Sequence, residues 1–245
     1  MKTVKLLMLT LAIGVFFSAC QKAQEATEEA VEDVTEAAED VAKAVVNVWE
    51  SDATISKAIV EEGAAEVPTA PEGSATFAVD LADSKLEWKG SKLAYAHNGT
   101  IDISAGSVMV DGEGNLMGGD FTIDMTSIAN LDVEDAEKNA KLVGHLASPD
   151  FFEVEQFPTA AFAITAIDEG TGMVSGNLTV KDQTHQVTFP AEIEVSDAGV
   201  TADALFSFDR TKWGVNFNSG NIFKDLVADN VISDDIALSL HLVAK

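Results

Sequence analysis

The sequence predicts a mainly β protein: an antiparallel β-barrel with one short helical insert, preceded by an N-terminal helical tether. Apolar and polar residues alternate strictly in segments such as 121–126 and 236–242, which is the period of strands with one buried face. Turn-forming clusters interrupt this pattern at 111–115, 168–172 and 196–199. Closure into a barrel is expected because it removes the exposed edges of so many antiparallel strands.

The first residues have the pattern of a signal peptide. Lys2 and Lys5 precede the apolar run 6–17, and two small residues then lead into Cys20, the single cysteine of the chain. This order predicts export, with residues 1–19 removed and Cys20 lipidated in a lipobox-like sequence. Acyl chains on Cys20 would contribute about 0.8 kcal/mol per buried methylene to membrane anchoring. The alternative is that this cysteine is a free or buried thiol.

Residues 23–48 contain neither Gly nor Pro and are rich in Ala, Val and acidic residues, which predicts a helix. One stripe of this helix would hold Ala23, Thr27, Ala30, Val34, Ala37, Val41, Ala44 and Val48. A coiled coil is one interpretation, so a homodimer stays an open alternative. A solvated spacer is favoured, because an Ala-rich seam buries little area and the acidic residues repel one another.

The domain organisation follows from where these patterns end. The helical pattern decays between 47 and 73 through a Pro- and Gly-containing stretch that is typical of a linker. Residues 20–73 are therefore expected to comprise the lipidated cysteine, the acidic tether and the linker, and residues 74–245 the barrel domain. A charged, Ala-containing stretch at 132–146 is the expected helical insert.

Charge and motif content argue against several classes of function. The chain has 15 Lys and Arg against 41 Asp and Glu, a net charge of −26, so nucleic acid is not an expected partner. Its four His are scattered, and neither a metal nor another cofactor is expected. A Gly-x-Ser-x-Gly elbow does not occur in the sequence, so the chain is not expected to be an enzyme.

A series of motifs carries a family resemblance. His145-Leu146, Asp150-Phe151-Phe152 and Phe157-Pro158-Thr159 are followed by Gly176-Asn177-Leu178-Thr179 and then Arg210-Thr211-Lys212-Trp213-Gly214. These motifs and their order resemble those of the YceI-like family, and the resemblance extends over about residues 77–243. The resemblance implies a lipocalin-like barrel that holds a long apolar molecule, such as a polyisoprenoid, an isoprenoid quinone or a related amphiphile. A barrel of about eight strands has room for one such ligand.

Within that resemblance, candidate ligand-binding residues can be assigned. His97 and His145 are expected at the pocket mouth, and Arg210 is expected to pair with a polar head group or, alternatively, with Asp209 or Asp150. The aromatic candidates for the cavity lining, which could equally be ordinary core, are Phe151, Phe152, Phe162, Phe208 and Trp213.

The expected location is the cell envelope, as a lipoprotein anchored in the outer membrane on its periplasmic or surface side. Two alternatives to a lipid carrier stay open. One is an envelope scaffold or stress lipoprotein whose barrel is solid. The other is a lipid-modifying enzyme that uses His145 and a carboxylate.

Overall fold

The computed structural model describes Trp49 and residues 54–245. The predicted signal peptide, the predicted lipidation site Cys20 and the predicted tether helix at 23–48 lie outside the described residues. The chain divides into two compact units after Asp52, and the unit Ala53–Lys245 is described here by itself. Within the described residues, no helix combines the length and the apolar character needed to cross a membrane.

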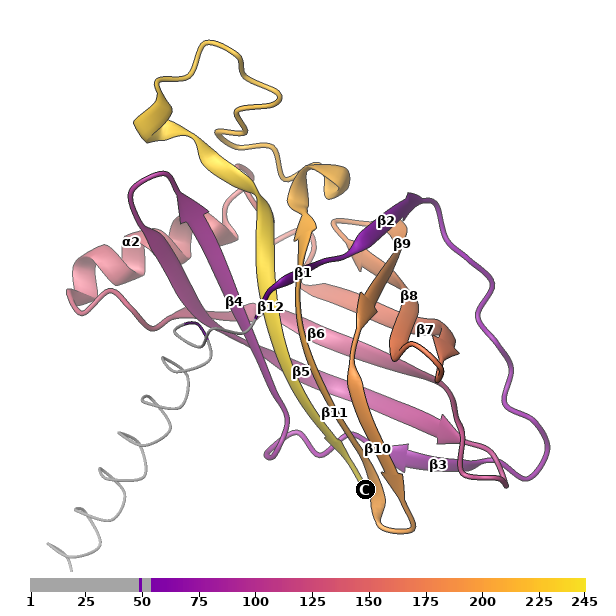
Figure 1. Ribbon diagram of the computed structural model, residues 1–245. Coiled ribbons are helices and arrows are strands. Elements are labelled where there is room, and N and C mark those ends of the chain that lie inside the picture. Colours follow the sequence, from indigo (N-terminus) through magenta and orange to yellow (C-terminus); the bar gives the residue numbers. More distant parts are fainter. Residues whose placement is uncertain (1–48, 50–53) are drawn as a thin grey trace, which may run out of the picture. The chain divides into compact units, whose positions relative to one another are not determined.

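Eight antiparallel strands form the wall of this unit (Figure 1). In spatial order they are β11 (Gly199–Asp209), β12 (Ile232–Ala244), β4 (Lys85–Lys92), β5 (Ala96–Val110), β6 (Leu116–Asn130), β7 (Thr159–Asp168), β8 (Met173–Val180) and β9 (Gln183–Pro190). Only Ala191 separates β9 from β10 (Glu192–Ser196), which pairs with β11. The path of strands therefore returns to its start, and the predicted mainly β barrel is confirmed.

The wall has a seam where the first half of β9 faces the second half of β11. Two short strands occupy it: β1 (Ser56–Lys57) runs parallel to β11, and β2 (Ile59–Glu62) runs antiparallel to β9. Between them Ala58 is buried, and its N–H donates to the carbonyl of Ser207 (2.8 Å). Part of the segment expected to be linker thus belongs to the folded unit. It was not predicted to form strands because strands of two and four residues are too short to produce a clear period-two pattern.

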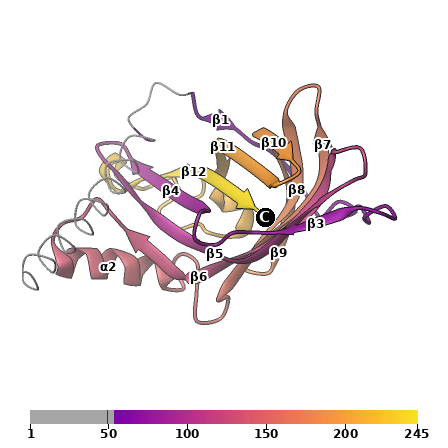
Figure 2. The ribbon, with the colours of Figure 1, turned by 90° about the horizontal axis from the view of Figure 1, so that it is seen from below.

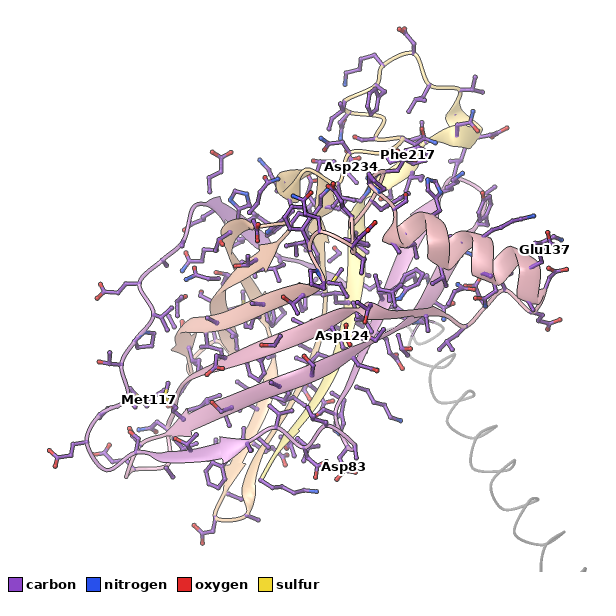
Figure 3. The ribbon with its side chains drawn as sticks, turned by 180° about the vertical axis from the view of Figure 1, so that it is seen from behind. Asp83, Met117, Asp124, Glu137, Phe217 and Asp234 are labelled. Atoms are coloured by element: carbon purple, nitrogen blue, oxygen red, sulfur yellow. The ribbon has the colours of Figure 1, made fainter. Side chains whose placement is uncertain are left out.

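The two ends of the barrel differ. The loop end carries the hairpin 93–95 between β4 and β5 and the long connection 214–231 between β11 and β12, which contains η2 (Ala228–Asn230) and follows η1 (Arg210–Trp213). At the opposite end β3 (Ala75–Ala78) pairs with the last residues of β5 (Figure 2). Phe217 and Asp234 lie at the loop end and Met117 and Asp83 at the opposite end (Figure 3).

One α-helix in the described chain, α2 (Ala136–Ala147), interrupts the strands at the predicted place. It begins after Asp135, whose carboxylate accepts the N–H of Lys138 (2.9 Å), a standard N-cap. None of its residues is fully buried. It packs beside the end of β6 and leads the chain back to the barrel at Phe151.

Candidate ligand-binding cavity

The barrel encloses two adjoining cavities, of about 150 Å³ and about 110 Å³. The first lies toward the loop end and the second toward the opposite end. Both are lined by Leu86, Ile123, Leu178 and Leu238. The two cavities together therefore extend along the interior of the barrel, and these four side chains lie where the cavities adjoin.

The lining is almost wholly apolar. Of its residues, only Trp88, Arg210 and Ser233 have polar groups, all in the first cavity, and the Trp88 indole N–H donates to the carbonyl of Thr100 (3.3 Å). Small inward-facing residues create the space: Ala160 in the first cavity, and Ala191, Ala202 and Ala204 in the second. A space of this kind excludes water, which would find no hydrogen-bond partners there.

The predicted aromatic residues are distributed over both cavities. Phe151, Phe152 and Phe208 line the first cavity, and Phe162 lines the second. Trp213 is fully buried, but it lies behind the lining, where its indole N–H donates to the carbonyl of Leu178 (3.0 Å). Its ring packs edge-on against that of Phe208, with 5.1 Å between the centroids. Trp213 thus supports the wall.

Arg210 lies at the loop end of the first cavity and is only 3% exposed. Its guanidinium donates to four backbone carbonyls, those of Val215 (2.5 Å), Phe217 (2.9 Å), Ile232 (3.3 Å) and Ser233 (3.0 Å). Its ion pair is with Asp234 (3.9 Å). Desolvation lowers the pKa of the guanidinium, an effect that Asp234 and Asp209 oppose. Arg210 therefore joins the two ends of the connection 214–231, and most of its donors are engaged within the protein.

His97 lies away from both linings, at the start of β5. Its Nδ1 is 2.8 Å from Oδ2 of Asp132. The other carboxylate oxygen, Oδ1, accepts the backbone N–H of Asn98 (2.9 Å) and a side-chain amide N–H of Asn130. Burial would raise the pKa of Asp132, but these hydrogen bonds hold it below the ordinary value. The cluster ties the end of β6 to the start of β5.

His145, in the last turn of α2, also lies outside the cavity linings. Its Nε2 is 3.1 Å from a carboxylate oxygen of Asp150. Its ring packs edge-on against those of Phe151 (5.0 Å) and Phe217 (4.7 Å). The structure thus brings His145, Phe151 and Arg210 together at the loop end, whereas His97 belongs to a separate cluster.

Within the described residues, His, Cys, Asp and Glu side chains form no group of three or more that could hold a metal ion.

A model of the YceI-like domain matches residues 77–244. The chain belongs to the YceI-like family. Similar sequences include a UPF0312 protein of Vibrio cholerae serotype O1, 30% identical over 148 residues, which are 56% of this chain and 74% of that protein. A UPF0312 protein of Staphylococcus epidermidis is 31% identical over 97 residues, which are 37% and 53% of the two chains.

Solved structures share this YceI-like fold. BcnA of Burkholderia cenocepacia is 26% identical, with a TM-score of 0.55 over 68% of this chain and 99% of its own. A polyisoprenoid binding domain from Saccharophagus degradans is 15% identical, with a TM-score of 0.50 over 69% and 97% of the two chains. The family match begins after β1 and β2, so the strands that fill the seam precede the YceI-like domain.

Sequence reasoning missed most of the lining. Leu178 belongs to one of the family motifs, but neither it nor Trp88 was assigned to the ligand, and most of the other aliphatic lining residues lie outside the motifs. The only sequence signal for these residues was the alternation of apolar and polar residues along the strands. This alternation identifies the face that points into the barrel, but not whether side chains fill the interior. The family motifs instead singled out residues such as Trp213 and His97, which support the wall and its connections.

Proposed function

We propose that this YceI-like protein binds a long apolar molecule, a polyisoprenoid, an isoprenoid quinone or a related amphiphile, inside its barrel. The two adjoining apolar cavities are the observation that carries the proposal. Apolar surface that moves from water into such a space gains about 25 cal/mol per Å². The likeness to the Saccharophagus degradans domain supports a shared fold, and the ligand named for that domain suggests the class to test first.

The size of the cavities favours a flexible chain as the ligand. Each cavity is smaller than the roughly 300–1,000 Å³ of typical ligand pockets. A long guest must therefore occupy both cavities and pass Leu86, Leu178 and Leu238, which line both. A narrow, flexible prenyl chain meets this condition better than a broad, rigid ring system does.

The polar groups of the lining favour binding over catalysis. Arg210 donates to backbone carbonyls, and the Trp88 indole is also engaged. Along the two linings there is no carboxylate or imidazole to transfer a proton. Together with the signal-like N-terminus, this supports a carrier held in the cell envelope by acyl chains on Cys20, in the outer membrane on its periplasmic or surface side.

The test is solvent extraction of the natively purified full chain, followed by mass spectrometry. Ala160 is buried and lines the first cavity, whereas its neighbour Ala161 is exposed on the outer face of β7. Ala160→Leu should fill part of the cavity and reduce the extracted lipid at least fivefold without loss of thermal stability. Ala161→Leu, the matched control, should retain the lipid.

A wild-type protein with no extractable lipid, and no change in Trp fluorescence when an isoprenoid quinone is added, would contradict the proposal. That result would favour the envelope scaffold. Equal lipid content in all three proteins would place the ligand outside the first cavity.

A further inference from the structure

Exposed apolar side chains gather on the two connections that project from the loop end. Leu93 in the hairpin is 77% exposed and Val227 in the connection 214–231 is 68% exposed. Tyr95, Ile222 and Phe223 are about half exposed. We call these five residues the rim. Single exposed apolar residues are ordinary, but a group at one end of a molecule indicates an interaction site.

The two parts of the rim lie at the same end of the barrel as the first cavity. Lys92, the last residue of β4, pairs with Ile232, the first residue of β12, so the hairpin and the connection arise from neighbouring strand ends. Gly90 and Ile232 both line the first cavity. The hairpin and the connection therefore project from the end of the barrel that holds the first cavity (Figure 1).

Polar interactions hold the rim outward. Arg210 binds carbonyls at both ends of the connection 214–231. Further along it, the side chain of Asn221 donates to Asp234. In the hairpin, the Lys92 ammonium lies 5.5 Å from the centre of the Tyr95 ring. The apolar side chains of the rim are thus exposed, at the end of the barrel that holds the apolar first cavity.

We propose that the rim inserts into the surface of a zwitterionic lipid bilayer, so that the first cavity opens toward the membrane. Separate projecting tips with aliphatic and aromatic side chains are suited to insertion between lipid head groups. They lack the continuous area of about 800 Å² that each partner buries in a standard protein interface. Asp225 and Asp229 flank the rim, and the chain carries a net charge of −26, so anionic lipid would repel it.

This inference rests on the proposed function, because an apolar ligand has to pass between a membrane and the cavity. Its test does not require the ligand. The full chain with Cys20→Ser has no cysteine, so a single cysteine can be placed at will. Val227→Cys places a polarity-sensitive nitrobenzoxadiazole label on the rim. Glu113→Cys, in the exposed turn between β5 and β6 at the opposite end, is the matched control.

With phosphatidylcholine vesicles, the label at position 227 should shift to the blue and brighten at least twofold, while the label at 113 should not change. Adding Leu93→Ser and Phe223→Ser should weaken the apparent affinity at position 227 at least fivefold. Replacing a third of the lipid with phosphatidylglycerol should also weaken it. No response at 227, or equal responses at both sites, would overturn the inference.

Extraction of lipid from the same proteins separates this inference from the proposed function. Bound lipid without a response at position 227 would overturn only the membrane docking. A response at 227 without extractable lipid in the wild-type protein would overturn only the carrier function.

Discussion

Arg210 provides a sharp test of the structure, because its side chain has two interpretations, contact with a ligand head group or support of the loop end. Its guanidinium is buried and donates to four carbonyls on the two ends of the connection 214–231. Arg210→Met keeps an apolar stem of similar length but removes every donor. The four carbonyls then lose their partner, and Asp234 loses its counter-ion.

The magnitude follows from these losses. Each buried acceptor left without a donor costs about 1–3 kcal/mol, and breaking a buried ion pair from one side costs about 3–5 kcal/mol. Water can reach some of the freed carbonyls, so these effects do not add. We expect Arg210→Met to lower the free energy of unfolding by about 3–5 kcal/mol. Arg210→Lys should recover little of this, because a single ammonium cannot span carbonyls on both ends.

Urea unfolding followed by Trp fluorescence measures the change, since the fully buried Trp213 lies three residues from Arg210. Lys212→Met is the matched control, because the Lys212 side chain is 44% exposed, and it should change stability by less than about 0.5 kcal/mol. A loss below about 1 kcal/mol for Arg210→Met would refute the reasoning. If lipid content fell while stability held, the ligand-contact interpretation would be correct instead.

Three further predictions concern the wall. Glu61 of β2 and Gln186 of β9 are Cα partners within the seam. Cysteines at these two positions should cross-link on oxidation in a cysteine-free background and stabilise the fold by about 2–4 kcal/mol. Free thiols that persist in mass spectra after oxidation would contradict this register. The pKa of Asp132 is lowered in the folded protein. Its carboxylate therefore stabilises the fold at pH values above the ordinary Asp pKa of about 3.9, and this contribution is lost as the pH falls through the lowered pKa. In urea unfolding, Asp132→Asn should therefore be less stable than the wild type at pH 7, and this difference should disappear at a pH below the lowered pKa. A difference in the free energy of unfolding that stays the same at both pH values would contradict the prediction. Gly99→Ala should lower the melting temperature, because the added Cβ would overlap a backbone carbonyl of β6, whereas Gly112→Ala, at a turn with open space around it, should not; equal shifts would count against this packing.

The wall could be predicted from the sequence because each strand carries its own signal. In β6 the alternation of Phe121, Ile123 and Met125 with polar residues marks the inward face, and these three side chains are buried. The helical insert was predicted from the composition of its own segment, which is charged and contains Ala: α2 covers 136–147, close to the predicted 132–146. Such elements can be predicted because the pattern that indicates them lies within their own segment of the sequence.

The seam and the role of Arg210 could not be predicted because both depend on distant residues. β1 and β2 become strands only where β9 and β11 leave a gap between them. For Arg210, sequence proximity suggested Asp209 or Asp150, but the fold supplies Asp234 and carbonyls from both ends of a long connection. Neither relation leaves a local pattern in the sequence.

The energetics of the empty barrel connect its stability with ligand binding. At about 24 cal/mol per Å³, the 150 Å³ first cavity costs about 4 kcal/mol relative to a filled interior. A guest in the cavity restores the lost contacts and binds only the folded state, so it must stabilise the protein as its concentration exceeds the dissociation constant. Removing a bound lipid should therefore lower the melting temperature, and Ala160→Leu should make the protein less sensitive to that removal, because its side chain already occupies part of the space.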